Sequence, residues 1–383
     1  ETTIQLERCL TLRRQVYGDR HPAVAECLYQ FGKLYEAVAD WESSHGVLVE
    51  ALAILEDQSV RDEIAIADAR ANLAWTLEHR WGHEAAWEPL QQAAIGFQEH
   101  AGETDPRTLL CKVDVARMHW LRREPLAAIE LLDRIDQVEW DSLHQRPAET
   151  LRALAHFAKV KQEVGELAAG DALFRQQLRL TKLWFGERHP AVASSLSDIA
   201  KSTFQLGRIE DAIRLTQDAH GILRQYFDPD SPTRLQNLCY EAGYRWAWGD
   251  YGVAESVFRA ALQLEDQRHP DGRSQRWVGI ISSLAVVLRD AGRWEDAESY
   301  FQQAFDAANL RSSVDPILIA RLINNLARLE FLRGNYFRAE ALARDALAGR
   351  SSALESNHPD LAETKLVLGS ILTECGDVQE AGG

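Results

Sequence analysis

Basic side chains recur at a fixed interval along this chain of 383 residues, and their charge predicts binding of an anionic group. They are spaced by 42 residues or a multiple of it, with one residue inserted late in the chain, and are Lys33, Arg117, Lys159, Lys201 and Arg328. Ammonium and guanidinium groups form charge-assisted hydrogen bonds with carboxylates. This basic column therefore predicts an acidic or carboxylate-bearing ligand. The alternative is a solvated face whose cations neutralise nearby acids such as Glu36, Asp68 and Glu78.

Large aromatic residues recur three positions after this basic column. They are Trp120, Phe204, Trp246 and Phe331. Aromatic side chains are frequent anchors of protein interfaces, so their recurrence predicts contact with a partner. Packing of the rings against a neighbouring repeat is the alternative, because large rings also fill the space between helices.

The sequence lacks the motifs that usually carry catalysis. It contains no GxxxxGK[ST] phosphate loop and no GxGxxG, GxSxG or HExxH pattern. Its histidines are scattered, and no nucleophile stands at a readable spacing from a base. We therefore expect no enzymatic activity, no metal site and no cofactor in this segment.

The five cysteines are also widely separated along the chain. They are Cys9, Cys27, Cys111, Cys239 and Cys375, and no CxxC pair occurs among them. This pattern predicts neither a disulfide framework nor a zinc site. It is typical of a protein in the reducing cytoplasm.

Two rows of small residues indicate the elements that must position these columns. The earlier row is Gly32, Ala74, Ala116, Ala158, Ala200, Ala242, Ala285, Ala327 and Gly369. The later row, twelve residues further on, is Ser44, Ala86, Ala128, Gly170, Ala212, Ala254, Ala297, Ala339 and Ala381. Self-similarity at such an interval predicts a solenoid. The small residues mark where two helices of each repeat approach closely.

Each interval contains the signals of one helical hairpin. Apolar or small residues at helical spacing predict one helix around 281–288 and a second around 297–304, with Gly292 between them. Proline is favoured in the first turn of a helix, so X-Pro pairs predict where the first helix of a repeat begins. These pairs are His21-Pro22, Asp105-Pro106, His189-Pro190, Ser231-Pro232, Asp315-Pro316 and His358-Pro359. For their histidines we expect a capping or packing role.

The interval also predicts the organisation of the chain. Residues 1–18 are expected to form the second helix of an incomplete repeat, residues 19–356 eight full repeats, and residues 357–383 an incomplete ninth. The polar segment 266–276 is out of phase, which predicts a flexible loop or an irregularity there.

Composition limits the classes of partner. The net charge is −16, so neither nucleic acid nor an anionic membrane is expected to bind, because both require a basic surface. No apolar run approaches the roughly 18–20 residues that span a bilayer, and we expect no signal peptide.

The repeat resembles the tetratricopeptide repeat family, and most closely its 42-residue subtype, as in kinesin light chain and bacterial signalling proteins. The resemblance is carried by Asn324-Asn325-Leu326-Ala327, Gly334-Asn335-Tyr336, Ala339 and Ala346. It implies an all-α, right-handed superhelical solenoid of antiparallel helix pairs, whose first helices line a concave groove that receives a peptide or a partner helix. It also implies that asparagines at matching positions, Asn72 and Asn325, grip that ligand.

Three functions follow from this resemblance and from the two columns. The first is a non-catalytic module that binds a peptide or partner protein in the groove. The second is the regulatory or sensing arm of a larger signalling enzyme, such as a STAND-type ATPase, a protein kinase or a caspase-like protease, in which case the partner includes other domains of the same polypeptide. The third is a structural spacer, which would have a polar groove without aromatic residues.

Overall fold

The computed structural model describes residues 2–58, 61–269, 274–310, 315–354 and 358–376, without the side chain of Thr2. Its described residues form helices and no strand, which confirms the predicted all-α class. The α-helices are α1 (Thr2–Tyr17), α2 (Pro22–Ala37), α3 (Trp41–Glu56), α4 (Glu63–Trp81), α5 (His83–His100), α6 (Pro106–Leu121), α7 (Pro125–Asp136), α8 (Pro147–Glu163), α9 (Leu167–Phe185), α10 (Pro190–Gln205), α11 (Ile209–Tyr226), α12 (Pro232–Ala247), α13 (Tyr251–Arg268), α14 (Gln275–Asp290), α15 (Trp294–Asn309), α16 (Pro316–Leu332), α17 (Tyr336–Ala353) and α18 (Pro359–Cys375). A short 3-10 helix, η1 (Trp140–Ser142), follows α7.

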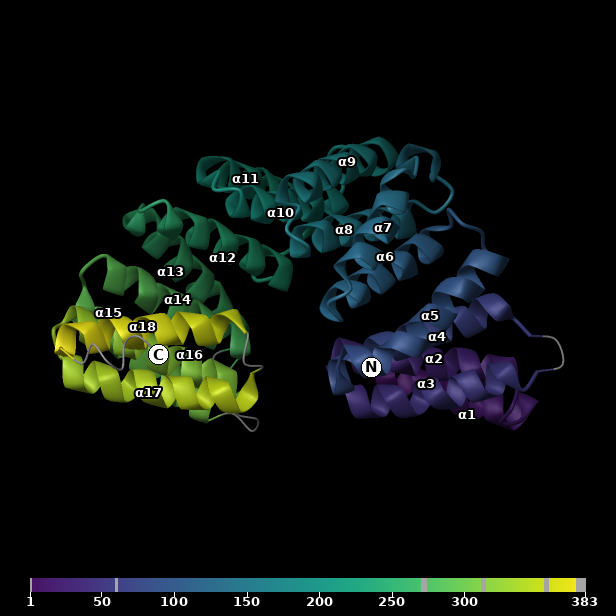
Figure 1. Ribbon diagram of the computed structural model, residues 1–383, viewed down its shortest axis with the longest axis horizontal. Helices are drawn as coiled ribbons and strands as arrows, with labels where there is room; N and C mark the ends of the chain where they lie inside the picture. The colour runs from purple at the N-terminus through teal and green to yellow at the C-terminus, as the bar shows by residue number, and fades with distance from the viewer. Residues whose placement is uncertain (1, 59–60, 270–273, 311–314, 355–357, 377–383) are drawn as a thin grey trace. The chain divides into compact units, whose positions relative to one another are not determined.

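The helices group into two compact units. Unit 1 spans residues 1–187 and contains α1 to α9, and unit 2 spans residues 188–383 and contains α10 to α18. Within each unit, consecutive helices pack side by side as hairpins (Figure 1). Even-numbered helices are the first helices of the hairpins, and odd-numbered helices are the second. The predicted boundaries at residues 18 and 356 stay a prediction, and residues 377–383 lie outside the described part of the chain.

Both rows of small residues lie where first and second helices touch. Every described member of the later row is buried, and in the earlier row only Gly369 is not fully buried, while Ala381 lies outside the described residues. A Cβ atom added to Gly32 would lie 2.7 Å from Cδ2 of Leu48, and one added to Gly170 would lie 2.7 Å from the carbonyl oxygen of Ala158. Close approach of the paired helices therefore requires small residues here, as the interval predicts.

The X-Pro pairs begin first helices, as the sequence predicts. Proline is the first residue of α2, α6, α10, α12, α16 and α18. Nδ1 of His21 accepts a hydrogen bond from the backbone N–H of Ala23 at 3.1 Å, and His189 and His358 cap their own helices in the same way. These histidines satisfy a backbone N–H that has no partner within the helix, so their predicted role as caps is confirmed.

The turn inside each hairpin places one residue in the left-handed region, and the two units fill this position differently. In unit 2 it is always glycine, at Gly207, Gly249, Gly292, Gly334 and Gly376, with φ between 78° and 87°. In unit 1, Ala39 (φ 58°) and Arg123 (φ 63°) stand at the same place in the repeat. A Cβ atom is strained in this conformation, so unit 1 carries strain at two turns that unit 2 avoids.

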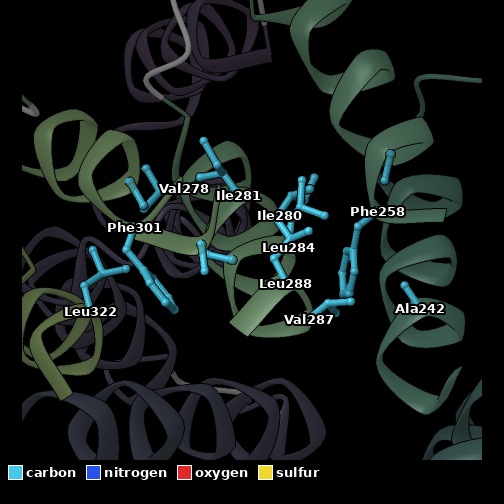
Figure 2. Packing of buried hydrophobic residues seen from close by; sticks show 14 of the residues in the cluster. Ala242, Phe258, Val278, Ile280, Ile281, Leu284, Val287, Leu288, Phe301 and Leu322 are labelled. Carbon is cyan, nitrogen blue, oxygen red and sulfur yellow. The ribbon is translucent and has the colours of Figure 1, made fainter. Parts of the chain in front are cut away.

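The core of unit 2 follows the predicted apolar stripes. Leu284 and Leu288 of α14 and Phe301 of α15 are 0% exposed. Figure 2 shows the α14 side chains between Phe258 of α13 and Phe301 of α15. Helical spacing along α14 therefore supplies apolar residues to both neighbouring helices at once.

The polar segment 266–276 is partly helical. Helix α13 continues to Arg268 and α14 begins at Gln275, while residues 270–273 lie outside the described part of the chain. The irregularity predicted there therefore stays a prediction. Among the described residues, no helix is both long and apolar enough to cross a bilayer.

Candidate functional site

The inner faces of the first helices line an open hollow in each unit. The hollow of unit 1, groove 1, measures about 850 Å³, and that of unit 2, groove 2, about 750 Å³. The polar and aromatic residues of groove 1 are Tyr29, Lys33, Glu36, Asp68, Asn72, Trp75, Phe97, Arg107, Asp114, Arg146, Glu149, Arg152, His156 and Lys159. Those of groove 2 are Gln236, Tyr240, Trp246, Phe258, Gln275, Arg276, Ser282, Ser283, Arg289, Arg321, Asn325, Arg328 and Glu363. Two smaller hollows, of about 390 and 320 Å³, share residues with groove 2 and so adjoin it.

Groove 1 mixes charges of both signs. Arg107 bonds to the carboxylate of Asp105 at 3.0 Å and lies 3.8 Å from that of Asp68. Nε2 of His156 lies 2.8 Å from Oδ1 of Asp114. Arg107, Arg146 and His156 thus face an acid, and a ligand must compete with those contacts, whereas the other basic side chains of this hollow have no carboxylate within 4.0 Å among the described residues.

The predicted residues of groove 1 also contact its own walls. Nδ2 of Asn72 donates to the hydroxyl of Tyr29 at 2.9 Å and to the carbonyl of Asp68 at 2.8 Å. Nζ of Lys33 lies 5.0 Å from the centre of the Tyr29 ring, a cation–π arrangement. Lys159 is exposed, and no carboxylate in the described part of the chain lies within 4.0 Å of it. Of the three, Lys159 is the most available to a ligand.

Burial disfavours the charged form of two acids in groove 1. Burial raises the pKa of the Asp68 carboxyl above its usual range, although Arg107 acts in the opposite direction. Burial also raises the pKa of Glu36, against the effect of a hydrogen bond from Thr76. Burial and the charge of Asp68 raise the pKa of Tyr29 to about 12. Burial causes the shifts of both carboxyls, because the charged neighbours of Asp68 are cations that act in the opposite direction. Groove 1 differs from groove 2 in its lining, which holds four acids against the single Glu363.

Groove 2 contains a buried arginine with unused hydrogen-bonding capacity. Arg289 of α14 is 2% exposed, and its Nε donates to Oδ1 of Asp290 at 2.7 Å. The other oxygen of Asp290 accepts from Nε1 of Trp246 at 2.9 Å, so this carboxylate is held from two sides. Nη1 of Arg289 is buried and has no hydrogen-bond partner among the described residues. An unpaired donor on a buried cation is unfavourable by roughly 1–3 kcal/mol or more.

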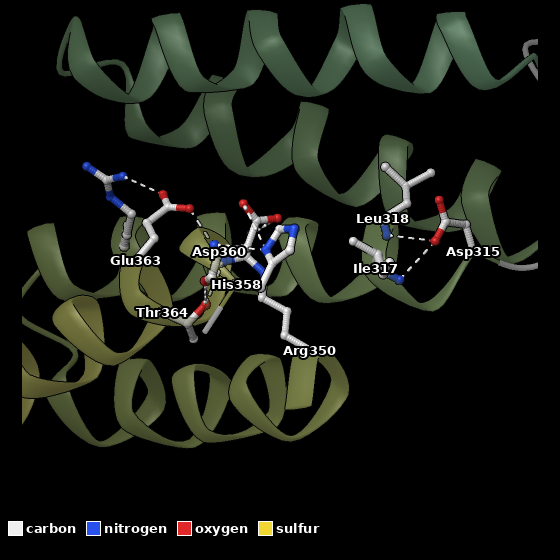
Figure 3. Close-up of polar contacts among 9 residues, drawn as sticks. Asp315, Ile317, Leu318, Arg350, His358, Asp360, Glu363 and Thr364 are labelled. Carbon is white, nitrogen blue, oxygen red and sulfur yellow. Dashed lines mark hydrogen bonds and ion pairs between the residues drawn. The ribbon is translucent and has the colours of Figure 1, made fainter. Parts of the chain in front are cut away.

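A second carboxylate of groove 2 is shared between two arginines. Oε1 of Glu363 lies 3.5 Å from Nη1 of Arg328, and its Oε2 lies 3.4 Å from Nη1 of Arg350. Arg350 is buried and also donates to the Asp360 carbonyl and the Thr364 hydroxyl, both at 2.6 Å (Figure 3). Glu363 therefore neutralises Arg328 only in part.

The remaining arginines leave groove 2 with an excess of positive charge. Arg321 of α16 is exposed, and the described residues offer it no carboxylate within 4.0 Å. Burial, and then the neighbouring charge of Arg289, hold the pKa of Arg328 below its usual value. Arg276 pairs only distantly, at 4.0 Å, with the buried Glu265. Four arginines thus line groove 2 against one acid of its lining, Glu363.

Four predicted residues of unit 2, besides Arg328, line groove 2 or a hollow that adjoins it. Trp246, 36% exposed, and Asn325 line groove 2 itself. Lys201 lines the adjoining hollow of about 390 Å³, 4.7 Å from the centre of the Tyr240 ring. Phe331 lines the hollow of about 320 Å³ and packs on Tyr336. The structure thus brings these predicted residues to one connected surface.

Three predicted residues line neither a groove nor an adjoining hollow. Arg117 forms two hydrogen bonds with the carboxylate of Glu78, at 2.6 and 2.7 Å, and its side chain is 14% exposed. Phe204 packs on Tyr244 with ring centres 4.9 Å apart. Trp120 is half-buried. Partner contact by these residues stays a prediction, and for Arg117 it would require breaking the ion pair.

Sequence reasoning missed most of the groove, although a signal was present. The basic column stands one position after each small residue of the first helices, and the same helical face recurs about three and seven residues earlier. The residues seven positions before that column include Asp68, Arg152, Gln236, Arg321 and Glu363. Arg289 stands at a position of the aromatic column, which predicts partner contact for the rings alone.

Among the described residues, no group of three or more His, Cys, Asp or Glu side chains is placed to hold a metal ion.

Comparison with known families identifies the repeat. One sequence profile of the tetratricopeptide repeat matches residues 4–57 and 149–225, and a second matches residues 277–309 and 319–360. Together the matches cover more than half of the chain, and they include helices of both units. No curated protein sequence matches the chain.

Solved structures with the same fold are distant in sequence. The apo form of the quorum sensor NprR from B. thuringiensis is 14% identical, with 79% of this chain and 82% of that one covered and a TM-score of 0.55. Aspartyl phosphate phosphatase F from Bacillus subtilis is 13% identical, with 94% and 91% covered and a TM-score of 0.54. The apo form of RapI is 12% identical, with 85% and 97% covered and a TM-score of 0.52. At these identities the similarity concerns the fold alone.

Proposed function

Since the chain belongs to the tetratricopeptide repeat family, we propose that it is a non-catalytic interaction module whose first helices bind a peptide or an extended segment of a partner protein. Groove 2 is the binding site, and its ligand carries an acidic side chain or a terminal carboxylate. The alternative, a sensing arm of a larger signalling enzyme, stays a prediction and is compatible with the same ligand.

The observation that carries this proposal is the unpaired Nη1 of Arg289 beside Arg321 and Arg328. A ligand carboxylate placed among these side chains would accept the missing hydrogen bond and supply the missing negative charge. Arginine favours such ligands because its planar fork matches the two carboxylate oxygens. Hydrogen bonds between charged groups contribute about 1.5–3 kcal/mol, which is enough to select acidic over neutral ligands.

Other residues of groove 2 suit the remainder of a peptide. The amide of Asn325 stands on α16 between Arg321 and Arg328 and is a hydrogen-bonding group for peptide backbone. The indole of Trp246 is fixed by Asp290 and presents a rigid aromatic surface at low entropic cost. The site thus combines charge selection with an aromatic contact.

Selection from a randomised peptide library on the whole chain tests the proposal. We expect the selected peptides to be enriched in Asp and Glu or to end in a required free carboxylate. Titration calorimetry with a selected peptide should show at least about a tenfold loss of affinity for Arg321→Glu. The matched control is Arg224→Glu, an exposed arginine on the second helix α11, which should keep affinity within about twofold of the unchanged chain.

Two results would overturn this function. One is enrichment of basic or purely apolar peptides. The other is an equal response of binding to Arg321→Glu and Arg224→Glu, which would place the ligand outside groove 2. Circular dichroism of both variants separates loss of binding from loss of fold, because both positions are exposed and neither packs in a core.

A further inference from the structure

Two cysteines that are distant in sequence meet between the first two helices. Sγ of Cys9 on α1 lies 3.2 Å from Sγ of Cys27 on α2. The chain's three other cysteines, Cys111, Cys239 and Cys375, are free thiols with no such neighbour in the described part of the chain. We propose that Cys9 and Cys27 form a site of reversible oxidation, where a small-molecule disulfide such as oxidised glutathione converts the two thiols to a cross-link between α1 and α2.

The geometry needs only a small adjustment for bond formation. A disulfide has its sulfur atoms about 2.05 Å apart, so the two thiols must approach by roughly 1 Å. Both side chains are on helices that already pack together, and Arg13 of α1 fixes the seam beside them. Nη1 of Arg13 donates to the carbonyl of Ala23 at 2.6 Å and to Glu26 at 2.7 Å, both on α2.

The repeat explains why these two residues face each other. Cys9 stands where later second helices carry Ala51 and Ala93, and Cys27 stands where later first helices carry Ala69 and Cys111. Ala51 belongs to the same core cluster as Ala69, and Ala93 to the same cluster as Cys111. The two positions thus belong to one core cluster at each of the next two hairpin interfaces, and at the first interface both are cysteine.

The two thiols have different accessibility, which sets the order of the steps. Cys27 is 3% exposed, and burial, together with the neighbouring Cys9, raises its pKa to about 11. Cys9 is only half-buried, so an oxidant reaches it first. A thiolate is the attacking species in disulfide exchange, and access determines which thiol reacts.

The chemistry balances with oxidised glutathione as the oxidant. Cys9 loses its proton and its sulfur attacks one sulfur of the oxidant, whose S–S bond breaks as one glutathione leaves and takes up a proton. Cys27 then loses its proton, attacks Sγ of Cys9 and displaces the second glutathione. The protein gives up two electrons and two protons, and the oxidant is reduced to two thiols.

The cross-link would fix a weakly held helix. Helix α1 has no fully buried side chain among its described residues, and Leu12, Val16 and Tyr17 are more than half exposed. Helix α2, on which it packs, supplies Tyr29 and Lys33 to groove 1. Oxidation therefore joins the end of unit 1 covalently to a wall of its groove.

Incubation of the whole chain with oxidised glutathione tests the site. We expect the number of free thiols to fall from five to three. The intact mass should fall by two hydrogen atoms, a non-reduced digest should contain a Cys9–Cys27 cross-linked peptide, and dithiothreitol should restore all five thiols. Amide hydrogen exchange in α1 should slow at least about tenfold on oxidation.

Four results would overturn the proposal. The first is no reaction with oxidised glutathione, and the second is one glutathione that stays attached to Cys9. The third is loss of the Cys111 and Cys239 thiols as readily as those of Cys9 and Cys27, and the fourth is an exchange rate of α1 that stays unchanged on oxidation.

Variants taken from the repeat itself provide the controls. Cys9→Ala and Cys27→Ala each introduce the residue that other repeats hold at that position, so both should fold and neither should form a cross-link. Persistent loss of two thiols in either variant would contradict the assignment. Ala93→Cys places a cysteine in the same core cluster as Cys111, where the native residues are 0% and 4% exposed. Oxidised glutathione should therefore cross-link this pair far more slowly than Cys9 and Cys27, and an equally fast loss of its two thiols would contradict the role of access.

Discussion

Groove 1 and groove 2 are built on the same face of the same repeated helix, yet they differ in electrostatics. In groove 1, Arg107 and His156 contact carboxylates, and burial raises the pKa of the acids Glu36 and Asp68. In groove 2, the carboxylates are shared, Arg321 has no acidic partner among the described residues and a donor of Arg289 is unpaired. The repeat therefore provides a scaffold, and side-chain pairing decides which hollow retains binding capacity.

The largest expected effect comes from breaking the scaffold that both grooves share. Ala297→Trp in unit 2 and Ala86→Trp in unit 1 each force a large ring between paired helices where the native residue is 0% exposed. We expect each to lower the free energy of unfolding by about 3 kcal/mol. Urea denaturation measures this, with the exposed Gln303→Trp on α15 as the control. An unchanged midpoint for Ala297→Trp would show that the small residues do not set the helix spacing.

Charge reversal distinguishes the two grooves directly. Arg328→Glu in groove 2 should lower the affinity for an acidic peptide selected on this chain by about tenfold or more, because the substitution removes a guanidinium group and adds a negative charge that repels the peptide. Lys159→Glu in groove 1 should change the affinity by less than about twofold, since that hollow already contains four acids. Calorimetric titration of both variants measures the difference. A stronger effect of Lys159→Glu would assign the ligand to groove 1 instead.

The hairpin turns offer a smaller test of the difference between the units. Arg123→Gly should raise the free energy of unfolding of unit 1 by about 1 kcal/mol, because glycine adopts a positive φ without strain. Gly249→Ala in unit 2 should lower stability by a similar amount for the same reason. Thermal and urea unfolding check both signs, and two changes of equal sign would refute the explanation from backbone strain.

The smallest predicted effect concerns the pKa of Asp68 in groove 1. Its folded-state pKa is raised above the ordinary value of 3.8, so the folded protein binds the proton more tightly and Asp68 is destabilising above that pH. Asp68→Asn should therefore stabilise unit 1 near pH 7 and lose this advantage as the pH falls below the ordinary carboxyl range. The side chain is 38% exposed, so screening by solvent keeps the gain under about 1 kcal/mol. The melting temperatures of the unchanged chain and of Asp68→Asn should therefore converge as the pH falls. A difference that stayed constant with pH would show that burial of the charged carboxylate is not the cause.

Much of the fold was predictable because its signals are local in sequence. Pro22 and Pro190 start helices through their fixed φ, and Gly292 and Gly334 end hairpin turns through their positive φ. The site was harder to predict. Lys159 and Arg328 of the basic column line the two hollows, and their role in binding stays a prediction, whereas Arg321 lies two turns away from Arg328 on the same helix and outside the column.

The spacing of residues in the sequence does not predict which side chains on different helices contact each other. Arg117 belongs to the predicted column, yet it bonds to Glu78, which is 39 residues away in sequence. Cys9 and Cys27 looked isolated because they are separated by a turn and two partial helices. In both cases the contact depends on which rotamers meet across a helix interface.

The sequence by itself determined that this chain is built of helical hairpins, since close packing at a regular interval requires small residues and turn residues whose spacing is visible in the sequence. Only the tertiary structure decided which charges remain available. An ion pair neutralises a cation only when two side chains from separate helices reach within about 4 Å of each other. For that reason Arg117 is engaged by an acid, while Arg321, also on a first helix, remains without one among the described residues.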